Sequence, residues 1–123
     1  MSITRRQLRD LYNHLAEIME VTARHVGSAI SELSDEIIAN LPEPERAEAA
    51  REYGPGVDRD VRIEKLRRKV EEIDKMVATG LVSDEMKKQR QRIKALADLL
   101  EAQKELEKIA GGYREAAASY ADD

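Results

Sequence analysis

The sequence lacks cysteine, tryptophan and phenylalanine, and four tyrosines are its only large aromatic residues. Without cysteine the chain forms neither a disulfide nor a thiolate metal site, and the reducing cytoplasm is the expected compartment. Apolar residues never exceed three in a row, as in residues 37–39, whereas crossing a bilayer takes roughly 20. The amino terminus is charged with no apolar stretch behind it. We therefore expect no membrane partner and no secretory signal.

A basic excess is also missing. The chain has 123 residues, with 21 Lys and Arg against 25 Asp and Glu and a net charge of −4. This balance argues against a general binder of polyanions, which usually carries a strong positive charge. The length favours a single domain.

Proline and glycine are sparse, and they divide the chain into a few long segments. The breaks fall at Pro42 and Pro44, at residues 54–56, at Gly80, and at residues 111–112. Between them the composition is rich in Ala, Leu, Glu, Lys and Arg, without strict alternation of apolar and polar residues, which indicates helix only. The predicted fold is all-α: a long N-terminal helix packed on an antiparallel helical hairpin, in an elongated, coiled-coil-like bundle that forms one domain.

Residues 1–41 are predicted to form one long amphipathic helix. Thr4 and Gln7 match a capping box at its start, and apolar residues then recur in steps of three and four, with a shift of one position near Thr22. Residues 42–57 form a connector that contains a short, polar, exposed helix, with Pro44 in its first turn.

Residues 58–110 are predicted to form the hairpin. Its first arm carries a heptad seam of Ile63, Leu66, Val70, Ile73 and Val77. A turn at Gly80 and Leu81 leads into a second arm whose apolar positions include Met86, Ile93, Leu96 and Leu100. Helix continuity beyond the two glycines at 111–112 is doubtful because together they cost about 2 kcal/mol of helix propensity. Residues 111–123 are therefore expected to be a partly helical or frayed tail.

The leading functional hypothesis is a non-enzymatic assembly or adaptor protein that acts through helix contacts and self-association. A thin core without large aromatic residues leaves apolar stripes half covered, and another helical surface is their natural partner. We expect no cofactor, no metal and no small-molecule substrate. His14 and His25 lie some 16 Å apart along one helix and cannot share a metal. The expected partner-binding residues are Leu8, Leu11, Leu15, Ile18, Leu106, Ile109 and Tyr113.

An alternative is a nucleic-acid-associated small subunit, of the kind found in phage DNA packaging or in nucleic-acid-guided complexes. The residues that would bind are Arg67, Arg68, Lys69, Lys87, Lys88, Arg90, Arg92 and Lys94. If the hairpin turns at Leu81, acids of one arm lie beside many cations of the other, which favours paired surface charges over a phosphate-binding face. By this register Arg62 and Lys65 fall near Asp98 and Glu101, and residues 67–69 are the cations least accounted for.

A second alternative is a carboxylate metal enzyme. Glu17 and Glu20, followed by Glu32 and Asp35, resemble the paired acidic motifs of all-helical nucleotide pyrophosphohydrolases, which hold magnesium beside a phosphate chain. The two pairs have to converge from different helices, so this hypothesis requires the N-terminal helix to be two helices.

Overall fold

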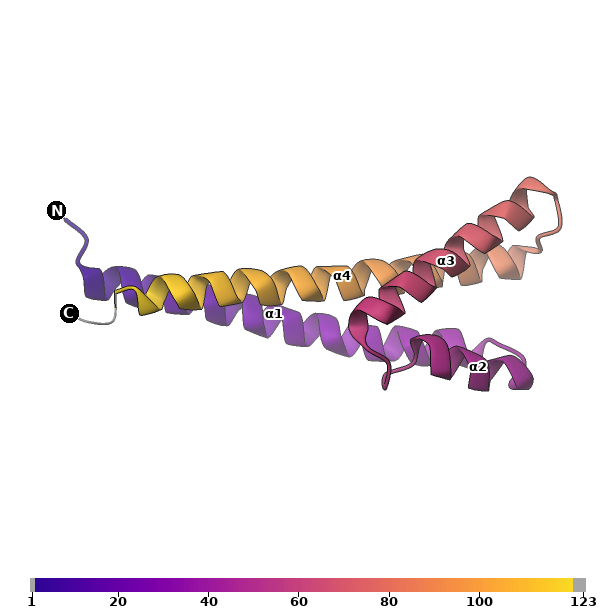
Figure 1. The fold of residues 1–123 in the computed structure, drawn as a ribbon, viewed down its shortest axis with the longest axis horizontal. Helices are drawn as coiled ribbons and strands as arrows, with labels where there is room; N and C mark the ends of the chain where they lie inside the picture. Colours follow the sequence, from indigo (N-terminus) through magenta and orange to yellow (C-terminus); the bar gives the residue numbers. More distant parts are fainter. Residues whose placement is uncertain (1, 121–123) are drawn as a thin grey trace. The chain divides into compact units, whose positions relative to one another are not determined.

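The protein is all-α. A computed structural model describes residues 2–120, and these form four helices with no strand among them (Figure 1). The helices are α1 (Arg5–Ala39), α2 (Glu43–Tyr53), α3 (Arg59–Ala78) and α4 (Asp84–Ala118). None of these helices combines the length and the apolar character needed to cross a membrane. The predicted fold class is confirmed, with α1 packed against α4 and α3.

The helix ends follow from local side-chain chemistry. At the start of α1 the Thr4 N–H donates to Gln7 Oε1 over 2.8 Å and the Gln7 N–H donates to Thr4 Oγ1 over 3.0 Å, which is the predicted capping box. Asp58 caps α3 by accepting from two backbone N–H groups of its first turn. Gly80 lies in the turn that follows α3 and has φ +75°, a left-handed conformation that favours glycine.

The connector helix α2 differs from the expectation that it is exposed. Ala49 and Tyr53 are both 4% exposed, so one edge of α2 belongs to the protein interior. The sequence pattern does not predict this burial, because α2 is only 11 residues long and the one alanine and one tyrosine that are buried make no apolar stripe. Pro44 lies in its first turn, as predicted.

Helix α4 continues through Gly111 and Gly112 to Ala118. The residues that the sequence analysis separated as a tail from 111 onward are therefore helical as far as residue 118. On either side of the glycines Ala110 and Ala117 are buried, at 4% and 3% exposed. Packing on both sides holds the helix together and outweighs the poor helix propensity of the two glycines.

The chain divides into two compact units. Unit 1 comprises residues 1–27 and 102–123, and unit 2 comprises residues 28–101. Unit 1 is thus an antiparallel pair made from the first part of α1 and the last part of α4. Unit 2 contains the remainder of these two helices together with α2 and α3.

Unit 2 has a core of large side chains and one buried cation. Its fully buried members include Ile37, Leu66, Ile93, Leu96 and Leu100. Leu66 and Ile73 of the predicted seam are buried, while Val77 at its end is 41% exposed.

Arg62 is the buried cation of unit 2, at 8% exposed, and sequence patterning gave no sign of this role. Its Nε donates to the Tyr53 carbonyl and its Nη2 donates to Ser34 Oγ, each over 3.0 Å. Burial lowers the pKa of the Arg62 guanidinium. This side chain fastens α3 to α1 and to the end of α2 by hydrogen bonds.

Candidate interaction surface

The interior of unit 1 consists of alanine. Among its described residues, only Ala16, Ala23, Ala110 and Ala117 are buried, at 0 to 6% exposed. The two residues of each helix are seven apart and therefore share one face of that helix. Alanines at the contact leave no room between the helices for larger side chains, which lie along its flanks.

A glutamine amide fixes the pairing of the two helices in unit 1. Gln103 Nε2 donates to the Ala23 carbonyl over 3.4 Å. A Cβ on Gly27 would lie 3.0 Å from this same Nε2, so the glycine provides the space for the amide. Gln103 precedes Ala110 by seven residues and continues the alanine line of α4.

Most of the large apolar side chains of unit 1, other than Ile3 and Val21, form a surface that we name the apolar face. None of them is buried, and Leu11, Ile18 and Ile109 are 46%, 42% and 38% exposed. All seven of the predicted partner-binding residues belong to it. The apolar face comprises Leu8, Leu11, Tyr12, Leu15, Ile18, Met19 and Val26 of α1 and Leu106, Ile109, Tyr113, Ala116 and Tyr120 of α4.

Three tyrosines join the two helices at one end of this face. The Tyr12 ring stacks on the Tyr120 ring with centroids 6.0 Å apart and an interplanar angle of 7°. The Tyr113 ring is a second neighbour of the Tyr12 ring, with the two centroids 6.1 Å apart. The Arg5 guanidinium lies 5.6 Å from the Tyr120 centroid and closes this end of the cluster by a cation–π contact.

Charged side chains are excluded from the apolar face. Projected at about 100° per residue, the charged residues of unit 1 fall outside the arc of the face on either helix, except for Arg5 at its end. Thr22 lies within the arc, but its hydroxyl donates to the Ile18 carbonyl over 2.8 Å. The polar group of Thr22 is therefore satisfied by its own helix.

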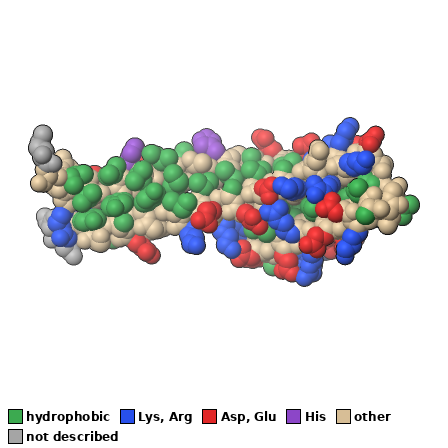
Figure 2. Space-filling model, turned by 90° about the horizontal axis from the view of Figure 1, so that it is seen from above, with side chains coloured by type: hydrophobic (Ala, Val, Ile, Leu, Met, Phe, Trp, Pro, Cys, Tyr) green, Lys and Arg blue, Asp and Glu red, His purple; other side chains and the backbone are tan. Residues whose placement is uncertain are grey.

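Figure 2 shows this distribution directly. Over unit 1, the hydrophobic side chains of the face in view form one continuous green area. Over the part formed by unit 2, red and blue side chains are interspersed instead. A contiguous apolar surface of this kind marks an interaction site more often than scattered exposed leucines do.

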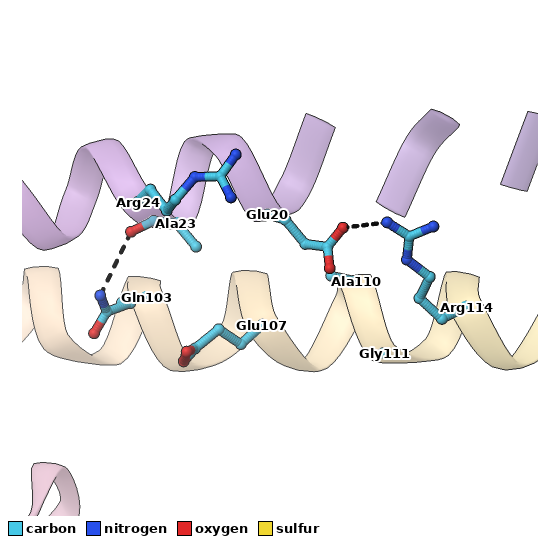
Figure 3. Close-up of a pocket in the computed structure, with 8 residues that line it drawn as sticks. All are labelled: Glu20, Ala23, Arg24, Gln103, Glu107, Ala110, Gly111 and Arg114. Atoms are coloured by element: carbon cyan, nitrogen blue, oxygen red, sulfur yellow. Dashed lines mark hydrogen bonds and ion pairs between the residues drawn. The ribbon is translucent and has the colours of Figure 1, made fainter. Parts of the chain in front are cut away.

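The opposite flank of the alanine contact is polar. Arg114 Nη1 donates to Asn13 Oδ1 over 3.0 Å and Arg114 Nη2 pairs with Glu20. A groove of about 400 Å³ lies here above Ala23, Ala110 and Gly111, and Figure 3 shows Arg24, Gln103 and Glu107 along its walls. Since its cations and acids are of equal number, the groove favours neither an anionic nor a cationic ligand.

Unit 2 contains a second, more apolar groove of about 610 Å³. Its rim carries Lys69 and Lys75 but also Glu45 and Glu72, so its charge selects no ligand class either. The apolar part of the lining consists of Leu41, Tyr53, Ile73, Met76, Met86 and Ile93.

Most cations of the nucleic-acid hypothesis are neutralised within unit 2. Arg67 pairs with both Asp98 and Glu101, over 2.9 and 3.0 Å. The two cations that follow it each pair on their own helix, Arg68 with Glu64 and Lys69 with Glu72. Residues 67–69, which the sequence analysis left least explained, thus all have carboxylate partners.

The run from residue 87 to 94 is also largely paired. Arg90 Nε lies 2.6 Å from Asp74 Oδ1, and this hydrogen bond holds the pKa of Asp74 below its usual value. Lys94 lies 2.8 Å from Asp98 and, together with Arg67, lowers the pKa of Asp98. Lys87 and Lys88 make no ion pair within the described part of the chain. Arg92 lies 3.4 Å from both Glu36 and Glu85.

The hairpin register differs from the predicted one by a few residues. Asp74 pairs with Arg90, one of the cations at 87, 88, 90 and 92 beside which the register places it, but two residues from the position that a strict count from the turn gives. Asp98 and Glu101 were expected near Arg62 and Lys65, but both pair with Arg67, and Arg62 is buried elsewhere.

The condition for the carboxylate metal site is not met. Helix α1 is continuous from Arg5 to Ala39, so the two acidic pairs belong to one helix and not to two. Glu20 pairs with Arg114. Across residues 2–120 no group of three or more His, Asp or Glu side chains is gathered as metal ligands would be.

Comparison of the chain with known protein families, with curated proteins and with solved structures finds no match.

Proposed function

We propose that this protein is a non-enzymatic assembly or adaptor protein that acts through helix contacts, including self-association, at the apolar face of unit 1. One observation carries the proposal: among the described residues of unit 1 only alanines are buried, while the large apolar side chains stay at least partly exposed. A folded two-helix unit gains little by exposing leucine, isoleucine and tyrosine together in one area. A further helical layer would remove this surface from water.

Nucleic-acid binding receives less support. Phosphate binding draws on unpaired Lys and Arg because each phosphate contact exchanges a counterion for a protein cation. In the α3–α4 hairpin six of the eight candidate cations already have carboxylate partners. We therefore place the interaction on the apolar face of unit 1.

The test is the native mass of the protein, with a matched pair of variants. At micromolar concentration the unchanged protein should sediment as a species heavier than the 13.9 kDa chain. Ile18→Lys places a charge on the apolar face at a side chain 42% exposed, and we expect association to weaken by about tenfold or more. Val61→Lys changes a unit 2 residue that is 41% exposed and should leave the mass unchanged.

Circular dichroism of both variants distinguishes lost association from lost folding. A monomer of the unchanged protein at all accessible concentrations contradicts self-association. Equal weakening by Ile18→Lys and Val61→Lys would place the contact somewhere other than on the apolar face.

A further inference from the structure

We infer that a second copy of this chain occupies the apolar face, and that the two copies pack about a two-fold axis running across α1 and α4 of unit 1. In this arrangement α1 lies antiparallel on α1 of the second copy, and α4 lies antiparallel on α4. The four helix segments form one bundle. The inference rests on the proposed function and specifies its partner and geometry.

The absence of charge makes the apolar face compatible with itself. The chain has a net charge of −4, so most of its surface would repel a second copy at close range. The apolar face is free of this repulsion because it has no charged side chain between the Arg5 end and residue 26. No charge on it would therefore meet the same charge on a second copy. A two-fold interface brings the same patch of both copies together and therefore favours a patch with this property.

The extent of the face meets the lower limit for a specific interface. Residues 8–26 span about 27 Å at the helical rise, and two neighbouring helices are about 20 Å wide. Two such faces in contact cover roughly 1,000 Å² in total, about the smallest area expected of a biological interface. Aromatic residues, which are enriched in protein interfaces, are present at Tyr12, Tyr113 and Tyr120.

The direction of the axis follows from the sizes of the side chains along the face. One end carries Leu8, Leu11 and the tyrosine cluster. The other end carries Val26 and Leu106, with the smaller Thr22 and Ala102 beside them. The side chains therefore project further from the helices at the tyrosine end than at the opposite end. Close packing requires that large side chains of one layer meet small ones of the other.

The axis across the helices satisfies this requirement at both ends of the face. It places the tyrosine end of each copy on the opposite end of the other, so that Tyr120 meets Ala102 and Leu106 meets Ala116 of the second copy. On α1 it places Leu11 opposite Thr22. An axis along the helices would instead stack the two tyrosine ends on each other and hold the opposite ends apart, with Leu11 opposite Ala116.

Cysteine cross-linking tests this geometry without interference from native cysteines, because the chain has none. Leu11→Cys and Thr22→Cys are made as separate variants, mixed, equilibrated and oxidised. We expect disulfide-linked dimer in the mixture, at least about tenfold more than from either variant alone, since identical Leu11 positions would lie about 16 Å apart along the bundle. The control mixture pairs Leu11→Cys with Val61→Cys, which is 41% exposed in unit 2, and should give only collisional background.

The outcomes separate the two proposals. If sedimentation shows only monomer, the proposed self-association fails, and this inference fails with it. If the protein is dimeric but Leu11→Cys cross-links to Ala116→Cys, the axis runs along the helices and only the inference is overturned. The inference is also overturned if the protein is dimeric but Leu11→Cys cross-links no better to Thr22→Cys or to Ala116→Cys than to the Val61→Cys control. The interface then lies elsewhere.

Discussion

Units 1 and 2 contain the same two long helices, yet they bury opposite kinds of side chain. Along α1 the residues at positions 16, 23, 30 and 37 are seven apart and all buried, but the first two are alanines in unit 1 and the last two are isoleucines in unit 2. In unit 2 large side chains fill the space among four helix segments. In unit 1 the alanines bring two segments together and leave the large side chains outside.

The contrast shows that one heptad spacing serves two purposes. With large residues the line becomes the centre of a core, whose burial stabilises unit 2 by itself. With alanine the same line becomes a close contact, and the neighbouring positions are free to present an apolar surface. Burial rather than hydrophobicity alone therefore separates the stabilising residues of this chain from those we assign to binding.

The largest expected effect is a charge placed in the core of unit 2. Ile73 is 3% exposed, and Ile73→Asp should lower the free energy of unfolding by about 4 kcal/mol because the carboxylate has no buried partner. Urea denaturation followed by circular dichroism measures the loss. Val77→Asp, one turn further along α3 at 41% exposed, should cost under about 1 kcal/mol. Similar losses for the two variants would show that α3 is not part of the core.

A smaller effect is expected from the buried arginine. Arg62→Ala removes the donor to the Tyr53 carbonyl and to Ser34 Oγ, and leaving these acceptors unpaired should cost about 2 to 3 kcal/mol. Arg68→Ala is the matched control, since the Arg68 side chain is 63% exposed and pairs with Glu64 on its own helix. We expect it to cost under about 0.5 kcal/mol. The same denaturation measurement decides, and equal costs would contradict the role assigned to Arg62.

The smallest effect concerns alkaline pH. Burial, and then the charges of Glu52, Glu45 and Glu48, raise the pKa of Tyr53 to about 12 from 10.0. The folded state thus favours the neutral phenol, and this contribution is complete below pH 10 and is lost as the pH rises through 12. At pH 11 it amounts to about 1 kcal/mol. Tyr53→Phe keeps the ring but cannot ionise, so its unfolding free energy should fall less between pH 9 and pH 11 than that of the unchanged protein.

The helices and the hairpin are predictable because apolar steps and end signals are local. Thr4 with Gln7 and the turn at Gly80 act over a few residues, so the sequence alone reveals them. Predicting the hairpin register also requires the direction in which helical side chains point. A helical side chain leans toward the N-terminus of its own helix, and long arginines reach furthest. Arg90 and Arg67 therefore meet acids a few residues away from the position that a count from the turn predicts.

Tertiary arrangement limited the remaining predictions. The pattern of α3 gives no sign that Arg62 turns inward, because its acceptors at Ser34 and Tyr53 come from other helices. The seven-residue spacing of Ala16 and Ala23 was visible, but alanine is common on any helix surface and carries little weight without a partner helix. Leu11, Ile18 and Ile109 could be chosen from the sequence because they belong to apolar stripes that exceed what the hairpin can cover.

The division of the chain between the units sets an order of events during synthesis. Every residue of unit 2 has been made once Glu101 is added, whereas unit 1 needs residues 102–118 as well. On the ribosome, the first 27 residues must wait for the last helical turns of α4, with Leu8, Leu11 and Leu15 meanwhile lacking their final neighbour. The apolar N-terminal part of α1 is therefore the segment that stays exposed longest in the nascent chain. A chaperone or a neighbouring nascent copy has its best opportunity to bind there.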